Sequence, residues 1–585
     1  MAHLHRKIKK GRPYYYVREI QRVDGRPKVV SQIYLGSPET IAKRFAESAA
    51  QGKPERVAIR EFGSLFLAHE IEKRLGTIGL IDGLVPRAAR ETGPSVGEYF
   101  FYAWANRLID PRSKRALPDW YRATAVSEIR PVPVEELSSQ RYWEKWDRVS
   151  PEAVEAIGKA FFARLWSMQP APPECLLFDT TNYYTYMGSP TPSDLCARGH
   201  NKEGKHHLRQ LGLALLVDRG TELPLFYRVY EGNTHDSVVF RRIIDEMFGV
   251  MCGFNTTKQR LTVVFDKGMN SPEAIRTIDD HTRVHFITSY SPHFVEELAG
   301  TDLKQFAPLG NQDGEEDAVL AFRSRIPLWD QERTVVVTHN PKTARKKRYT
   351  LEQKLESLRL TLLEYRRAYR ERQPHWRNPE AIRERYLREC ERLHIGAQYY
   401  RLDFTEGDSC EMSFRKDPYQ VGKSEALFGR NVIVTDNHDW TTEEIVKHSL
   451  DRYRIEKQFR ASKSAAHVDV SPFYHWTDGK IRCHLLCCVI ALVALRMIET
   501  TVNANRAGEA ISGPTILDQM RQLHSALLLY PGKREAVRML ETPEKTQSEV
   551  LSAFGYRITD SGVLQETWRN MLISNIFMDL SPIIS

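Results

Sequence analysis

The chain contains 585 residues, with 84 Lys and Arg against 75 Asp and Glu and a formal net charge of +9. This length predicts about four structural units, and eight scattered cysteines argue against a secreted, disulfide-stabilised scaffold and favour a reducing cytosol. No apolar segment follows the basic N-terminus, so we expect no secretory signal. The longest apolar run, 485–495, is too short to span a bilayer and predicts a buried core helix.

The first 170 residues predict two units. Residues 12–36 alternate in strand fashion around the turn signal Asp24-Gly25, which predicts a β-hairpin arm over 1–36. From 37 to 170 the apolar spacing becomes helical, and a Pro-rich stretch closes the region. From its position and charge, we expect this helical domain and the arm to bind DNA.

A strand-rich block follows at 171–294. Its order is three strands, a helix, a strand, a helix and a strand, in the segments CLLFDTT, LRQLGLALLVD, LPLFYRVYEG, SVVFRRIIDEMFG, RLTVVFD, SPEAIRTIDD and VHFITSY. This order predicts an α/β fold with a mixed sheet flanked by helices.

An insertion at 295–435 changes the character of the chain. We expect strands near 317–338 and 398–414, separated by two highly charged helices. The first of these helices is compatible with a coiled coil, but a solvent-facing helical hairpin fits at least as well. The strand-and-helix pattern resumes at 436–505, and we expect a C-terminal helical region at 506–585.

Three acidic residues stand in settings that favour a shared site. Asp179 ends the first strand of the block, Asp266 ends its fourth strand, and Glu456 lies on a later helix with Arg452 and Lys463 near the same face. Carboxylates gathered at one sheet edge suit divalent cations, and two cations about 3.5–4 Å apart would support phosphoryl transfer. The plainer interpretations are a helix cap for Asp266 and a surface salt-bridge ladder for Glu456.

Two basic clusters suggest contacts with a phosphate backbone. Their members lie in HRKIKKGRPYYYVR at the N-terminus and in KTARKKR within the insertion: Lys7, Lys9, Lys10 and Arg12, then Lys346 and Lys347. A solvated charged face is an equally simple interpretation of either cluster. The group Cys483, Cys487 and Cys488 beside His484 could suggest zinc, but it lies on an apolar helix without a second ligand pair and favours core packing.

The spacing R-x3-E-x6-K, with two strand-end acids upstream, resembles the Y-R-E-K signature of DDE transposases from bacterial insertion sequences. The segments FDKGMNS and EGNTHD resemble the D-R-G-M-x-S and G-N-x-x-D elements of the same group, whose catalytic core carries a large β-rich insertion. This chain departs from the signature in one place, since Ser449 stands at the Tyr position and Tyr453 follows Arg452.

The resemblance implies a ribonuclease-H-like fold in which Asp179, Asp266 and Glu456 are catalytic and bind two Mg²⁺ or Mn²⁺ ions. Arg452 and Lys463 would contact the phosphates beside the scissile bond. The implied reaction is cleavage at the ends of a mobile element, followed by transfer of the freed 3′-hydroxyl into target DNA.

The partners implied are terminal inverted repeats, target DNA and a second copy of the chain in a homodimer, within the bacterial cytoplasm and nucleoid. Some relatives pass through a hairpin end and hold a flipped base on an aromatic side chain. Trp329 and Trp440 are candidates by location, although core packing is the plainer interpretation.

Two other functions remain open at this point. One is a catalytically inactive DNA-binding protein derived from a transposase, against which the presence of all three acids argues. The other is a phosphohydrolase acting on small molecules, which would have no use for the basic N-terminal arm.

Overall fold

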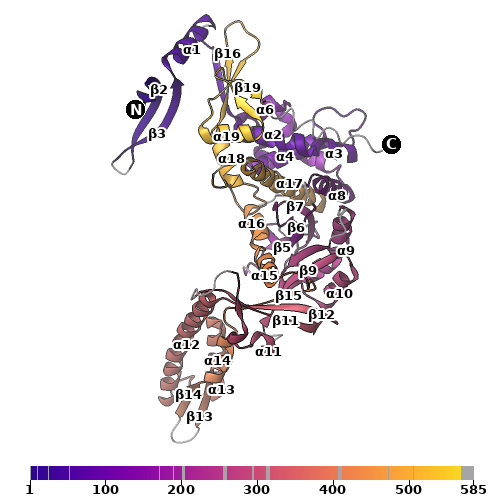
Figure 1. Cartoon of the computed structure of the whole chain (residues 1–585), viewed down its shortest axis with the longest axis vertical. Helices are drawn as coiled ribbons and strands as arrows, with labels where there is room; N and C mark the ends of the chain where they lie inside the picture. The colour runs from indigo at the N-terminus through magenta and orange to yellow at the C-terminus, as the bar shows by residue number, and fades with distance from the viewer. Residues whose placement is uncertain are drawn as a thin grey trace.

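The computed structural model describes residues 2–567, apart from short gaps at 10, 24–25, 52, 170–171, 189, 200–203, 255–259, 293–295, 311–316, 406–410, 472–473, 505 and 507. Lys10 and the turn residues Asp24 and Gly25 therefore lie outside the described residues. Figure 1 shows an elongated molecule with a small sheet at one end of its long axis and a helical projection at the other.

A nine-stranded mixed sheet forms the centre of the molecule. Its first part has the strand order β7-β6-β5-β8-β9, in which β5, β6 and β7 are antiparallel and β8 and β9 run parallel to β5. Helices α9 and α10 contact each other and strands of this sheet. The bounds are β5 Cys175–Thr185, β6 Arg209–Asp218, β7 Pro224–Glu231, α9 Asp236–Phe254, β8 Leu261–Phe265, α10 Pro272–Asp280 and β9 Val284–Tyr290. This order confirms the expected α/β, ribonuclease-H-like sheet.

The predicted insertion at 295–435 divides into two parts. Strands β10, β11, β12 and β15 continue the central sheet beyond β9, all antiparallel to their neighbours. Their bounds, with the short helix α11, are α11 Glu296–Ala299, β10 Ala307–Pro308, β11 Leu320–Leu328, β12 Gln331–His339 and β15 Arg430–Thr435. The expected strand at 317–338 is thus a hairpin within the main sheet.

The second part, residues 340–428, is a satellite with its own hydrophobic core. It contains α12 Pro341–Arg370, α13 Pro379–Leu393, β13 Tyr400–Thr405, β14 Glu411–Lys416 and α14 Pro418–Ala426. Side chains from α12 and α13 share that core, which confirms the helical hairpin over the coiled coil. The satellite is the projection at the lower end of Figure 1.

The helical region after residue 62 is continuous with the central core. Its helices are α2 Gly63–Leu75, α3 Thr77–Leu84, α4 Val96–Ile109, α5 Leu117–Ala123, α6 Val126–Ile129, α7 Ser139–Trp146 and α8 Pro151–Ser167. Helices α4 and α8 pack on α17 Asp478–Asn503, and side chains from these helices and from the sheet form one hydrophobic cluster. The predicted boundary near 170 therefore separates segments that share a core.

Helix α17 is long and apolar enough to cross a membrane by length and composition, but 83% of its most apolar window is buried inside the protein. The prediction of a core helix is confirmed. The neighbouring helices are α15 Thr442–Leu450 and α16 Tyr453–Ala461.

The sequence predicted a helical C-terminal region, and this prediction was wrong because strands alternate with the helices there. Helices α18 Gly513–Arg521 and α19 Lys545–Ala553 alternate with strands β16 His524–Leu529, β17 Val537–Leu540, β18 Tyr556–Ile558 and β19 Leu564–Glu566. Strand β16 pairs with β4 Arg56–Glu61, more than 450 residues earlier in the chain. Such distant pairing leaves no local signal in the sequence.

The N-terminal arm is a three-stranded antiparallel sheet followed by a helix. The hairpin of β2 Arg12–Val23 and β3 Arg26–Gly36 is confirmed, and β1 Ala2–Lys9 adds a third strand that the sequence prediction missed. Helix α1 Pro38–Gln51 follows. The basic residues of β1 masked its alternation, because a charge cluster and an amphipathic strand have similar composition.

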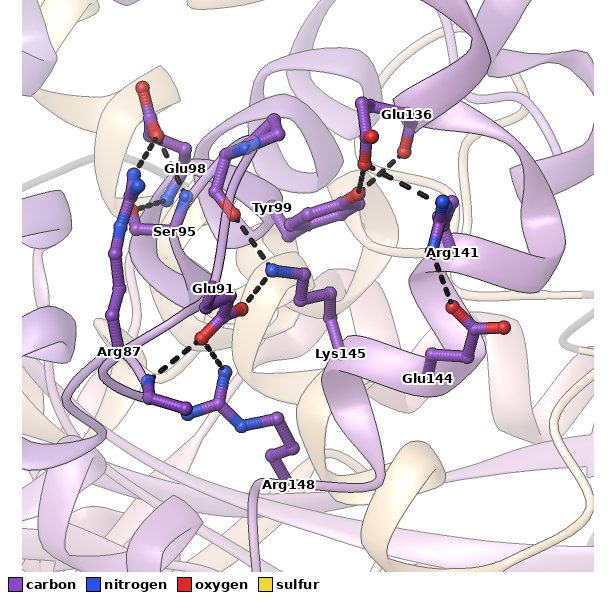
Figure 2. A network of polar contacts seen from close by, with 12 residues as sticks. Arg87, Glu91, Ser95, Glu98, Tyr99, Glu136, Arg141, Glu144, Lys145 and Arg148 are labelled. Carbon is purple, nitrogen blue, oxygen red and sulfur yellow. Dashed lines mark hydrogen bonds and ion pairs between the residues drawn. The ribbon is translucent and has the colours of Figure 1, made fainter.

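A polar network ties α7 to the segment before α4 (Figure 2). Lys145 and Arg148 both form ion pairs with Glu91, and the Lys145 ammonium also donates a hydrogen bond to the Pro94 carbonyl at 3.1 Å. Burial acts to raise the pKa of Glu91, but hydrogen bonds from Lys145, the Ala88 amide and Arg148 outweigh it and lower the pKa to about 2.

We expect Glu91→Gln to lower the Tm by about 2–4 °C at pH 7. A depressed folded-state pKa means that ionised Glu91 stabilises the fold above its ordinary value of 4.5, and that this contribution is lost as the pH falls toward about 2. The Tm values of wild type and variant should therefore converge in acid, as calorimetry can measure. Glu144→Gln, which removes a half-exposed partner of Arg141 in the same network, is the control; an equal loss there would contradict the assignment.

Candidate active site

The parallel register of β5 and β8 brings two of the predicted acids level with each other. Cys175 pairs with Thr262 and Leu177 with Val264, an offset of 87 residues. The same offset separates Asp179 from Asp266 (266 − 179 = 87). Asp266 keeps an extended backbone just after β8. Residues in register on adjacent parallel strands lie about 4.8 Å apart and point to the same face, so the two carboxylates share one edge of the sheet.

Helix α16 lies across β5 and brings the third acid to the same region. At its C-terminal end, Ser462 is hydrogen-bonded to the buried Tyr183 hydroxyl of β5, and the Lys463 ammonium lies 5.5 Å from the Tyr183 ring centroid. Tyr183 and Asp179 are four residues apart on the strand and therefore share a face. Glu456 lies about two turns back along α16 from Lys463, and Arg452, directly before the helix, about three turns back, toward Asp179.

Arg452 joins the start of α16 to the end of β8. Its Nη1 donates a hydrogen bond to Asp266 Oδ1 at 2.9 Å, and both side chains are partly buried. Glu456 is exposed, and no ion pair connects it to another described residue. The structure therefore pairs one acid with a basic residue of the signature and leaves another open toward solvent.

Electrostatics at the site disfavour three ionised carboxylates without a cation. Burial raises the pKa of Asp179 to about 6, and the negative charges of Asp266 and Glu456 act in the same direction. The Thr180 amide, which donates to Asp179 Oδ1 at 2.8 Å, and the Arg452 charge act in the opposite direction without outweighing burial. Asp266 and Glu456 thus both lie within electrostatic reach of Asp179.

The donor set fits a hard divalent cation. Among residues 2–567, outside the gaps given above, no group of three or more His, Cys, Asp or Glu side chains is already arranged around one metal position; Arg452 supplies positive charge instead. Carboxylate oxygens are the ligands that Mg²⁺ and Mn²⁺ prefer. A cation here would stabilise the ionised form of Asp179 and so offset the burial and the repulsion that raise its pKa.

Residues 187–492 match the family of transposase DDE domains, which is 306 of the 585 residues and just over half of the chain. The chain belongs to the DDE transposase family. The matched segment contains Asp266, Arg452, Glu456 and Lys463, and it begins eight residues after Asp179, which joins the site through the strand register.

A comparison of the transposase with curated protein sequences returned no match. Among solved structures, it is similar to a piggyBac transposase synaptic complex with hairpin DNA, determined by cryo-EM. The sequence identity is 10% and the TM-score 0.35, and the alignment covers 78% of this chain and 79% of that chain.

The predicted DNA-binding residues of the arm gather on one face of its sheet. In the β1–β2 register Lys9 lies opposite Arg12 and Lys7 opposite Tyr14, so these side chains share a face. Tyr16 and Tyr34 extend that face, with ring centroids 5.0 Å apart. Arg6 lies on the opposite face.

In the satellite, the basic cluster divides by partner. Lys342 and Arg345 form ion pairs with Asp317, and Arg348 pairs with Glu425. Lys346 and Lys347, the two residues predicted to bind DNA, are exposed on α12 and form no ion pair with a described residue.

The remaining sequence candidates have structural roles. Trp329 packs on Tyr290 with ring centroids 5.3 Å apart, and Trp440 lies 4.3 Å from the His448 ring. The cysteines of α17 are free and buried, and His484 Nε2 is hydrogen-bonded to the Val470 carbonyl, which confirms core packing for that group.

Sequence reasoning missed the ion pairs on the side of α16 that faces away from Asp266. Arg454 and Lys457 of α16 form ion pairs with Glu222, which lies in the connection between β6 and β7. These residues carry no motif, and only the fold brings them together.

We expect Asp179→Asn to stabilise the metal-free transposase at pH 8, by up to roughly 3 kcal/mol for a pKa shift of two units. Because its folded-state pKa of about 6 exceeds the ordinary 3.8, ionised Asp179 destabilises the fold. The wild-type protein should therefore lose stability as the pH rises from 4 to 6, and the variant should not show this loss. Thermal melts in chelator across pH 4–8 would show this, and a variant less stable than wild type at pH 8 would contradict it.

Proposed function

We propose that this protein cuts DNA at the ends of a mobile element and joins the freed 3′-hydroxyl to target DNA. The observation that supports this most directly is the level pair of Asp179 and Asp266, with Arg452 bound to one of them and Glu456 on the same helix. In cleavage, water attacks a phosphodiester phosphorus and the 3′-oxygen leaves. In strand transfer, that 3′-hydroxyl attacks a phosphorus of target DNA and displaces another 3′-oxygen.

Each residue has a distinct task in this proposal. Asp179, Asp266 and Glu456 would hold two Mg²⁺ or Mn²⁺ ions, which when bound activate the attacking oxygen and stabilise the leaving oxygen. Arg452 presents a planar fork that suits two phosphate oxygens, and Lys463 presents a compact charge on the same side of α16.

The distribution of charge supports DNA as the substrate. Residues 1–36 contain nine Lys and Arg against two Asp and Glu, and the satellite contains 20 against 14. These parts carry +7 and +6 of a total of +9, so the remainder of the chain carries −4. Figure 1 shows the two basic parts at opposite ends of the molecule, with α16 between them. A long polyanion can contact both ends and the site together, which a small substrate cannot.

Joining two element ends requires two active sites, so we infer that a homodimer assembles on the inverted repeats. The same reaction implies the other two partners that the sequence predicted, the terminal inverted repeats and the target DNA.

We expect Asp179→Asn, Asp266→Asn and Glu456→Gln each to reduce Mg²⁺-dependent nicking at least 100-fold while DNA affinity stays within about twofold, on the scale typical of electrostatic groups at a reacting centre. The assay uses a duplex containing the element end, with cleavage and binding measured separately. Glu443→Gln, an exposed acid on α15, is the matched control and should cut normally.

Two outcomes would contradict the assignment. Full cleavage by any of the three variants would exclude that residue from the metal site. Wild-type protein that binds the duplex but never cuts it would favour the alternative, a catalytically inactive DNA-binding descendant.

The arm can be tested through the salt dependence of binding. We expect alanine at Lys7, Lys9 or Arg12 each to reduce the slope of log affinity against log salt by about 1, because each residue neutralises one phosphate. Arg6→Ala, on the opposite face of the same sheet, is the control and should leave the slope unchanged. Equal effects on both faces would indicate diffuse attraction rather than a binding face.

A further inference from the structure

The connection between β6 and β7 holds a glutamate in an unusual backbone conformation. Glu222 has a φ of 57°, the left-handed region that residues other than glycine seldom adopt. The Asp218 carboxylate accepts hydrogen bonds from the Thr221 amide and hydroxyl, and the Glu222 amide donates to the Asp218 carbonyl at 2.8 Å. The turn is therefore tightly closed, and the glutamate cannot relax without breaking it.

The Glu222 side chain is buried among three basic residues. It is 8% exposed, and its carboxylate lies 2.9 Å from Arg454, 3.4 Å from Lys457 and 3.4 Å from Arg496. Arg454 and Lys457 belong to α16, whereas Arg496 belongs to α17. A single carboxylate thus joins the connection between two strands to both helices.

Further ion pairs extend this junction on both sides. Arg219, also in the connection, is 2.6 Å from Asp451 just before α16, and Arg454 is 3.3 Å from the same carboxylate. On the other side, Glu499 of α17 pairs with Lys457 at 3.2 Å and with Arg496 at 2.6 Å. Glu222 and Glu499 both pair with residues of α16 and α17, and of these two acids Glu222 is the one that lies in the connection between β6 and β7.

The two sides of α16 therefore have different tasks. Arg454 and Lys457, three residues apart, face Glu222, whereas Arg452 bonds Asp266 and Glu456, four residues further on, lies on the same side of the helix as Arg452. A helix residue turns about 100° relative to the one before it, so rotation of α16 that moves one pair moves the other. The ion pairs of Arg454 and Lys457 with Glu222 therefore also set the direction in which Arg452 and Glu456 point.

We propose that Glu222 is a positioning residue that holds α16 in the rotation that directs Arg452 and Glu456 toward Asp179 and Asp266. This inference rests on the proposed function of the site for its effect on cleavage. It also accounts for the backbone of Glu222. A left-handed glutamate and a desolvated carboxylate are both unfavourable, and the three ion pairs offset these costs.

Two substitutions separate the charge from the strained turn. Glu222→Gln removes the charge and keeps the shape, whereas Glu222→Gly removes the side chain and relieves the backbone strain. If Glu222 served only the turn, the glycine variant would fold and cut at least as well as wild type. Under the proposal, both variants cut DNA at least tenfold more slowly at saturating duplex, with affinity within about twofold.

Hydrogen exchange provides a readout that needs no activity. Amides of α16 should exchange at least tenfold faster in both variants, while those of α15 keep their wild-type protection. Asp417→Asn is the matched control, because Asp417 is an equally buried acid, paired with Arg401 at 2.8 Å in the satellite. It should change neither α16 exchange nor cleavage.

Wild-type exchange of α16 in both Glu222 variants would overturn the proposal, as would wild-type cleavage by them. The exchange result decides it even where the wild-type protein fails to cut, and that failure would count against the proposed function alone.

Discussion

The register between β5 and β8 is the constraint on which the site depends. Two buried strands run parallel with a fixed offset, and that offset sets Asp179, within β5, level with Asp266, directly after β8. A slip of one residue would turn one carboxylate to the other face of the sheet. The register is itself held by the burial of both strands, since Leu176, Leu177, Val263 and Val264 are fully buried in the core. Hydrophobic packing therefore sets the separation of the two acids.

The third acid reaches the site by a different route, through charge rather than through sheet packing. Helix α16 is short, and only Ile455, Gln458 and Phe459 of its residues are buried. Ion pairs on its far side and the Tyr183–Ser462 hydrogen bond at its end complete its attachment. The rotation of a helix attached in this way depends on a few side-chain contacts, whereas a strand in the middle of a sheet is held by a ladder of backbone hydrogen bonds.

Much of the central sheet could be predicted because its strands are apolar runs that end in recognisable turn or helix signals. The two aspartates after apolar runs and the spacing from Arg452 to Lys463 are local features, so the sequence alone could propose them as a site. The prediction that Asp179 ends its strand was wrong, because β5 continues to Thr185 in its pairing with β6. The number 87 was visible in the sequence, but its meaning as a parallel register requires the fold. The pairing of β4 with β16 and the strand β1 were missed, the first because it is distant in the chain and the second because its basic residues concealed an alternating pattern. Glu222 had no signal, since a buried left-handed glutamate is indistinguishable in sequence from an ordinary surface residue.

The central claim is that three carboxylates, distant along the chain, bind divalent cations together. Crystals grown at pH 8 with Mn²⁺, measured at the manganese absorption edge, test it most directly. The account predicts two anomalous peaks about 3.5–4 Å apart, bounded by Asp179, Asp266 and Glu456. Peaks elsewhere, or no peak with Arg452 still bound to Asp266 at saturating Mn²⁺, would contradict it.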